Sequence, residues 1–160
     1  MIVYHASYTV IVKPDINHSR VNTDFSKGFY LTTLKQQATL WANRMLFKYN
    51  TSFINEYEFN ENMLNKYKVL KFDSYNKKWL DFVMKCRKGI DKSNYDIVIG
   101  PVADDKVYDT INLYLEKLID EKETLKRLKS KKINNQICIR NQDTLNSLIT
   151  FVRGEKYNGK

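Results

Sequence analysis

Segments of strand-like composition are scattered irregularly among helical patterns along this chain, and this order constrains its fold more than any other feature. β-Branched and aromatic residues are concentrated in 2–12, 52–59, 67–72, 95–100, 136–140 and 148–152. Helical spacing of apolar residues marks 33–49, 79–87 and 105–118. Because strands and helices do not strictly alternate, the sequence favours an α+β fold over a doubly wound parallel sheet.

The clearest helical pattern follows Thr33. Apolar residues recur there at three- and four-residue spacing as far as Tyr49, which predicts an amphipathic helix of about four turns. Thr32 or Thr33 is expected to cap it. The segment 79–87 is expected to end at Gly89, and 141–146 is expected to form a turn between the last two strands.

Length and composition indicate one globular domain over 1–160. The chain has 160 residues, 42% of them hydrophobic, with only 5 glycines and 2 prolines, which argues against disorder. No stretch approaches the roughly twenty apolar residues of a membrane span, and "MIVYHASYTVIVK" lacks the features of a signal peptide. We therefore expect a cytoplasmic protein that does not enter the membrane.

The residues that usually bind metals are sparse. Cys86 and Cys138 have no histidine nearby, so buried free thiols are expected at both positions. With only His5 and His18, no multi-histidine site can form, and we expect no bound metal. His5, inside a strand, is either a hydrogen-bonded core residue or a catalyst, whereas His18 is expected to be exposed.

Two further features allow a functional and a structural interpretation. Asp104 and Asp105 follow a predicted strand and could act as acid and base, but an aspartate there also caps a following helix, which we favour. The charge of +9 attracts nucleic acid, acidic proteins or phosphate-bearing cofactors. Its densest part, 122–132, includes Leu125 and Leu128, as in an ordinary helix with a solvated lysine face.

Three segments resemble, in order and surroundings, the signature strands of the ADP-ribosyltransferase superfamily. They are "YHAS", "KGFYLTTLKQQATLWA" and "NNQICI". Together with "YDIVIGPVADD", they make the chain similar to a family of small bacterial proteins known only as a domain of unknown function and suspected to be toxins of toxin–antitoxin pairs. The resemblance implies two packed, mainly antiparallel sheets with flanking helices.

The resemblance also implies a site for NAD. His5 would orient the ribose, and Ala6 and Ser7 match a glycine and a hydroxyl residue, with the backbone of Ala6 holding the nicotinamide amide. Tyr30 would stack on the nicotinamide ring and Trp41 would be the second aromatic over it, although Trp41 could equally be a core residue. Phe29 belongs to the same signature, with its own side chain expected in the core.

Gln136 stands where the superfamily normally has a glutamate. A glutamine amide can still bond a ribose hydroxyl, but it brings no negative charge to the developing positive charge of the transition state. Arg20 could bind the pyrophosphate of NAD through two oxygens at once, or simply be exposed. The basic segment before Gln136 would help to select the acceptor.

We therefore expect an NAD-dependent mono-ADP-ribosyltransferase with His5, Tyr30 and Gln136 as catalytic residues. The acceptor would be a protein or a nucleic acid, and an antitoxin protein would be a partner. One alternative is an NAD glycohydrolase with water as acceptor. Another is an inactive basic module that binds nucleic acid.

Overall fold

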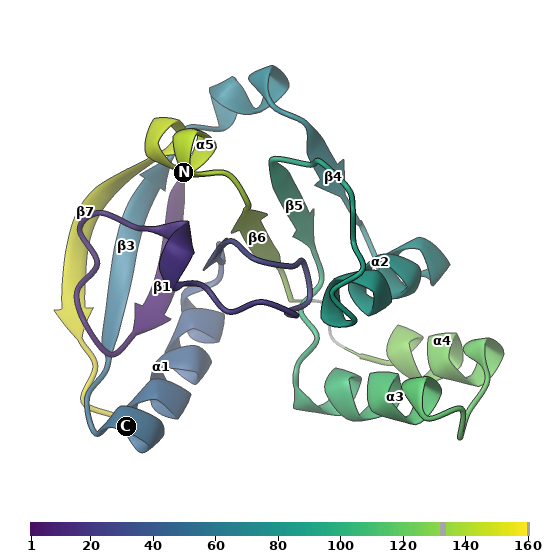
Figure 1. Cartoon of the computed structure of the whole chain (residues 1–160). Coiled ribbons are helices and arrows are strands. Elements are labelled where there is room, and N and C mark those ends of the chain that lie inside the picture. Colours follow the sequence, from purple (N-terminus) through teal and green to yellow (C-terminus); the bar gives the residue numbers. More distant parts are fainter. Residues whose placement is uncertain (132–133, 160) are drawn as a thin grey trace.

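The computed structural model describes residues 1–131 and 134–159, which form two sheets with helices around them (Figure 1). The first sheet has the order β1-β3-β7 and is antiparallel throughout. The second has the order β2-β6-β5-β4, in which only β4 and β5 pair in parallel. The predicted α+β architecture with two mainly antiparallel sheets is confirmed.

Seven strands and five α-helices make up these layers in the described residues. The strands are β1 (Ile2–Ser7), β2 (Phe29–Leu31), β3 (Phe53–Phe59), β4 (Val69–Lys71), β5 (Ile97–Gly100), β6 (Gln136–Ile139) and β7 (Ile149–Lys156). The α-helices are α1 (Lys35–Tyr49), α2 (Lys77–Arg87), α3 (Asp105–Leu115), α4 (Glu121–Lys129) and α5 (Gln142–Leu148). Two short 3₁₀ helices span Ile16–His18 and Glu61–Lys66.

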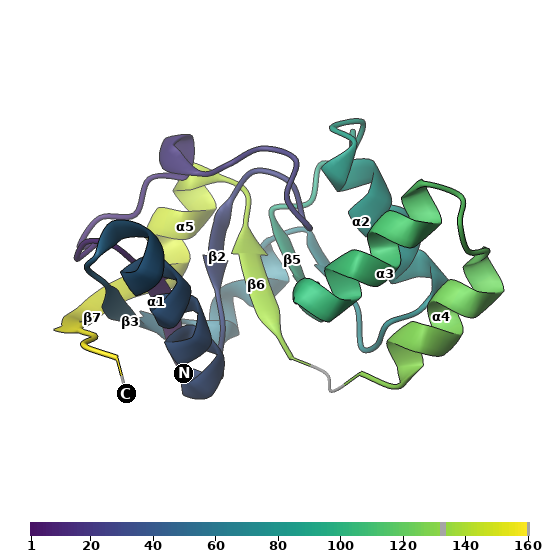
Figure 2. The same ribbon diagram turned by 90° about the horizontal axis from the view of Figure 1, so that it is seen from below.

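Residues of the second sheet alternate between two hydrophobic clusters. Ile97 and Ile139 belong to a cluster shared with Tyr57 of the first sheet and with α5. Val98 and Cys138, their neighbours along the chain, belong to a cluster with residues of α2, α3 and α4. These three helices gather on the side of the second sheet that faces away from the first sheet (Figure 2). The second sheet is therefore buried on both faces, which explains its continuously apolar strands.

Several predicted boundaries differ from the structure. The prediction of a turn at 141–146 is wrong, because this segment lies in α5, which Asn141 caps by accepting from the backbone N–H groups of Asp143 and Thr144. The helical cap expected at Thr32 or Thr33 falls on Leu34 instead, whose N–H donates to Thr32 Oγ1. Regular strand structure at the N-terminus ends at Ser7, short of residue 12.

The remaining helices agree with the pattern apart from their ends. Helix α2 begins two residues early, at Lys77, because the Asn76 side chain accepts from Trp79 N–H. Gly89 follows its end with a φ of +69°, the left-handed conformation that favours glycine after a helix. Helix α3 ends at Leu115 rather than at 118.

Gly28 is needed in this fold because of its contacts rather than its backbone angle. A Cβ placed on Gly28 would lie 2.5 Å from Cys138 Sγ and 2.7 Å from the carbonyl oxygen of Ile139. The carbonyl belongs to β6, which pairs with β2 directly after Gly28. The glycine therefore lets the chain approach β6 closely enough to begin the pairing.

Replacing Gly28 with alanine is expected to lower the free energy of unfolding by about 1–3 kcal/mol, because the added methyl group displaces the paired backbone of β6. Denaturant unfolding of Gly28→Ala measures this loss. Lys27→Ala, at the neighbouring and partly exposed position, serves as the control and is expected to unfold like the parent protein. Equal stability of Gly28→Ala and the parent would contradict the packing argument.

Candidate functional site

The three strands that carry the signature segments are neighbours in space. Tyr4 of β1 and Thr32 exchange backbone hydrogen bonds of 2.8 and 3.0 Å, which join β1 to the end of β2. Strand β2 then pairs with β6, with Tyr30 opposite Cys138. The backbones around His5, Tyr30 and Gln136 therefore form one continuous region, although they are far apart in the sequence.

His5 is held by this region through both its ring face and a ring nitrogen. Its Nδ1 lies 2.7 Å from the carbonyl oxygen of Tyr30, and its ring stacks on Phe29 at 4.4 Å between centroids. Because a carbonyl only accepts, Nδ1 carries the proton and Nε2 keeps a lone pair. Burial lowers the pKa of His5, against the raising effect of the Tyr30 bond, so the ring is neutral at pH 7.

Tyr30 points to the opposite face of β2 from Phe29. Phe29 and Leu31 lie in the cluster between the sheets, whereas Tyr30 packs against the cluster that contains Cys138. The side chains of His5 and Tyr30 are therefore on different faces of β2, and only the Tyr30 backbone meets His5. Phe29 is buried, as expected of a core residue.

The Tyr30 hydroxyl is bound by the loop that precedes its own strand. It donates to the carbonyl oxygen of Ser26 at 2.7 Å, accepts from Phe25 N–H at 3.0 Å, and lies 2.8 Å from Thr23 Oγ1. Burial raises the pKa of Tyr30 well above its usual value, and the nearby Cys138 thiol adds to this. The hydroxyl therefore stays protonated and holds the loop against β2.

Gln136 is 4% exposed and its amide is bound on the same face as Tyr30. Its Nε2 donates to Asp24 Oδ2 at 3.1 Å and to the carbonyl oxygen of Pro101 at 3.4 Å. Sequence reasoning missed Asp24 and also Arg87, which forms an ion pair with it. The available signal was an aspartate directly before Phe25, the one aromatic residue of the mainly polar segment 13–28.

Ala6 and Trp41 meet on the other side of β1. Ala6 packs in a third cluster with Ala38 and Ala42 of α1, and Trp41 packs against this cluster. The small residues let α1 lie directly on β1, which gives a packing reason for alanine at position 6.

Ser7 is buried at the end of β1 and is bound within the first sheet. Its hydroxyl donates to the carbonyl oxygen of Thr9 and accepts from Asn55 Nδ2 at 3.1 Å. Asn55 Oδ1 in turn accepts from the backbone N–H of Ile11 at 2.9 Å. Ser7 therefore takes part in fixing the chain that follows β1.

Trp41 also lines a hollow of about 310 Å³ between α1 and the start of α3, here called the α1–α3 hollow. Its other lining residues are Gln37, Leu40, Arg44, Val102, Asp104, Asp105, Lys106 and Asn134. Gln37 Nε2 donates to the carbonyl oxygen of Asn135 at 2.7 Å. Gln37 Oε1 is buried and has no hydrogen-bond partner among the described residues. The hollow thus lies close to the segment that leads into β6, with Asn134 in its lining.

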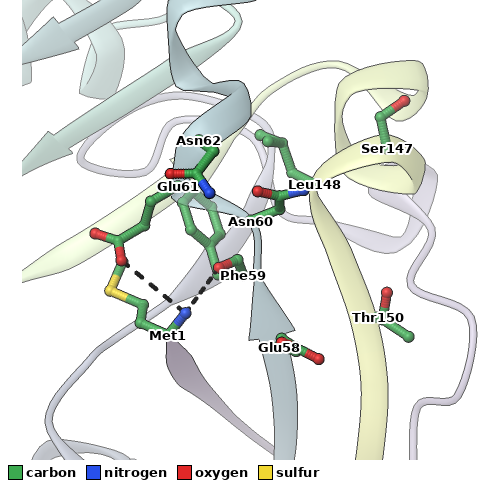
Figure 3. Close-up of a pocket in the computed structure, with 9 residues that line it drawn as sticks. All are labelled: Met1, Glu58, Phe59, Asn60, Glu61, Asn62, Ser147, Leu148 and Thr150. Carbon is green, nitrogen blue, oxygen red and sulfur yellow. Dashed lines mark hydrogen bonds and ion pairs between the residues drawn. The ribbon is translucent and has the colours of Figure 1, made fainter.

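A second hollow, of about 440 Å³, lies elsewhere, between the end of β3 and α5 (Figure 3). Its lining includes Met1, whose amino group donates to the carbonyl oxygen of Phe59 at 2.9 Å and lies 4.0 Å from Glu61. The lining contains none of the residues that the resemblance assigns to NAD. It is therefore the weaker candidate.

Asp104 and Asp105 take structural roles. Asp104 caps α3 by accepting from Val107 N–H, as favoured above, while Asp105 pairs with Arg44 at 2.8 Å. The side chain of Asp105 is 83% exposed. Asp104 therefore stabilises the start of α3, and Asp105 forms a surface ion pair.

The remaining candidate residues are either buried thiols or exposed side chains. Cys86 and Cys138 are buried free thiols, as expected, and burial raises the pKa of each to about 12. On the loop before β2, His18 is exposed and Arg20 is exposed as well. Residues 132 and 133 of the basic segment lie outside the described residues.

The described residues show neither a metal cluster nor a membrane helix. Within 1–131 and 134–159, no three histidine, cysteine, aspartate or glutamate residues gather in a way that could hold a metal ion. No helix of the same two segments is long and apolar enough to cross a membrane.

Comparison with known proteins places the chain in a family. A family described as "protein of unknown function (DUF3990)" matches residues 1–151. The chain belongs to this family. No curated protein and no solved structure matches this DUF3990 chain.

The Tyr30 hydroxyl predicts a measurable stabilisation. Tyr30→Phe is expected to lose about 1–2 kcal/mol of unfolding free energy, because Phe25 N–H and Thr23 Oγ1 lose a buried partner. Limited proteolysis is expected to cut faster within 19–28. Tyr8→Phe is the matched control, since Tyr8 is 54% exposed. Unchanged stability and cleavage in Tyr30→Phe would contradict the role assigned to the hydroxyl.

The protonation state of His5 predicts a second result. Because its folded pKa lies below the usual 6.5, its stabilising contribution is present above pH 6.5 and is lost as the pH falls through the folded pKa. Nitrogen NMR is expected to show the neutral ring with its proton on Nδ1 at pH 7. The variant His18→Gln keeps His5 as its single histidine, so its spectrum identifies the signals of the His5 ring. A ring protonated on Nε2 alone would contradict the bond to Tyr30.

Proposed function

We propose that this DUF3990 protein is an NAD-dependent mono-ADP-ribosyltransferase and the toxin of a toxin–antitoxin pair. The observation that supports the proposal most is the adjacency of β1, β2 and β6 with a neutral His5 bonded to the backbone of Tyr30. The resemblance in sequence assigns one part of the NAD site to each of these strands. Their adjacency is what such a shared site requires.

In the proposed reaction NAD is the substrate. The bond between the nicotinamide nitrogen and ribose C1′ breaks, and nicotinamide leaves with the electron pair. A nucleophile of the acceptor then forms a bond to C1′ and releases its proton. His5 Nε2 has the lone pair needed to accept from a ribose hydroxyl, and Trp41 offers a partly exposed aromatic face for the nicotinamide.

The net charge of the chain, +9, suits an anionic acceptor. The charges of the α1–α3 hollow itself balance, because Arg44 and Lys106 line it together with Asp104 and Asp105, and Arg44 pairs with Asp105. Cationic side chains bind pyrophosphate oxygens, and a positive field raises the local concentration of anionic acceptors. A nucleic acid or an acidic protein is therefore the acceptor class we propose.

One observation favours the alternative of an inactive binding module. The Tyr30 hydroxyl and the Gln136 amide are both bound by residues of the loop before β2. Turnover therefore requires NAD to reach the site without these bonds being lost, or with the loop displaced. An NAD glycohydrolase would use the same site, with water as the nucleophile.

Incubation with labelled NAD and, separately, lysate protein, RNA and DNA tests the proposal. We expect label on one macromolecule class, with at least about a tenfold lower rate in Trp41→Ala and Gln136→Ala, on the order of the cost of removing a transition-state contact. Phe47→Ala is the matched control for Trp41→Ala, because Phe47 lies on the same helix and is 95% exposed.

The other outcomes separate the alternatives. Free ADP-ribose without labelled macromolecule would identify a hydrolase. Intact NAD, together with salt-dependent nucleic-acid binding, would identify the binding module and overturn the proposed function. Equal loss of activity in Phe47→Ala would show that the α1 variants act through stability alone.

A further inference from the structure

Asp24 is a buried carboxylate to which three separate parts of the chain donate. Its Oδ1 accepts from Arg87 of α2 through Nη2 and, at 3.0 Å, through Nε, and the two side chains are 12% and 13% exposed. Its Oδ2 accepts from the N–H of Ala103 at 3.0 Å and from Gln136 Nε2 at 3.1 Å. The Arg87 guanidinium also lies 4.3 Å from the ring centre of Tyr108. The carboxylate is thus fixed by donors on both of its oxygens.

These bonds determine which way the Gln136 amide faces. Asp24 Oδ2 and the Pro101 carbonyl oxygen are both acceptors, so the amide must turn its NH₂ group toward them. Both hydrogens of Nε2 are then used. The carbonyl oxygen Oε1 is the remaining polar atom of the side chain, and it can only accept. At this position glutamine therefore presents the same kind of atom as a glutamate.

The same geometry makes an ionised glutamate unfavourable here. A carboxylate at position 136 would lie about as close to Asp24 as the present 3.1 Å bond, with no proton between the two groups. Two buried carboxylates at that distance cannot both ionise without a large cost. The negative charge that Gln136 lacks is present on Asp24, which accepts a hydrogen bond from the Gln136 amide.

We propose that Asp24 is the positioning residue for Gln136, and that the two act together in place of a single glutamate. Asp24 orients the amide so that Oε1 meets the reacting ribose, and its charge polarises the amide through the hydrogen bond. This inference rests on the proposed function. It differs from it in predicting a specific coupling between positions 24 and 136.

The first half of the test changes one position at a time. Gln136→Glu places two carboxylates together, and we expect it to lower the Tm by about 5 °C or more and to remove at least about nine-tenths of the transferase rate. Asp24→Asn removes the negative charge that pairs with Arg87 and polarises the Gln136 amide, and it is expected to be impaired in the same way.

The second half combines the two changes, so that donor and acceptor exchange places. In the double variant Asp24→Asn/Gln136→Glu, the new amide at position 24 can donate to the new carboxylate at position 136, although Ala103 N–H then loses the oxygen to which it donates. We expect this variant to regain at least about half of the lost Tm and to have a rate at least about fivefold above that of Gln136→Glu, as expected of two positions that interact directly.

Asp91→Asn is the matched control, because Asp91 forms a similarly buried pair with Arg140, at 2.6 Å. Combined with Gln136→Glu, it is expected to restore neither Tm nor rate. A Gln136→Glu protein with parental Tm and a higher rate would overturn the inference, as would a double variant at positions 24 and 136 that is no better than Gln136→Glu.

The proposed function can fail separately from this inference. If the parent protein leaves NAD intact, the transferase proposal and the positioning role both fall, whatever the Tm values are. If the parent transfers ADP-ribose but positions 24 and 136 show no coupling in Tm or rate, only the inference about Asp24 is wrong.

Discussion

Burial of the Asp24 carboxylate is the interaction on which the region around β6 depends. Removing a carboxylate from water costs several kcal/mol unless donors replace the water, and here Arg87, Ala103 and Gln136 all donate to it. These donors come from α2, from the segment before α3 and from β6. Losing any one leaves the charge partly unbonded, so the loop, the helices and the strand are held together as a unit.

The strand pair β2–β6 connects this polar network to the rest of the protein. Side chains alternate between the two faces of a strand. Phe29 therefore lies in the cluster between the sheets, whereas Tyr30 and Cys138 lie at the outer cluster. A shift of one residue would exchange these faces. The close approach at Gly28 and the hydroxyl of Tyr30 both oppose such a shift, which keeps His5 on one face and Gln136 on the other.

This separation bears directly on the proposed NAD site. The signature residues share a backbone region, but their side chains do not converge on one point in this structure. His5 offers a neutral ring nitrogen, Trp41 offers a face at the α1–α3 hollow, and Gln136 is buried and donates to the carbonyl oxygen of Pro101. The loop before β2 binds the polar groups of Tyr30 and Gln136, so its contacts decide whether a substrate can reach them.

The sequence by itself determined the α+β class, most strands and the long helices, because apolar periodicity and capping residues act within a few positions. It failed at α5, where polar residues typical of a turn form a helix that Asn141 caps. It also placed the end of the first strand too late, because β1 ends at Ser7. It also singled out the segments that form β1, β2 and β6, which are neighbours in the structure. It did not show to which face of the sheet each of their side chains points. Only the tertiary structure decided that Asp24 meets Arg87 and Gln136, because they are 63 and 112 residues away from it and no local pattern records which distant donors a buried carboxylate will find.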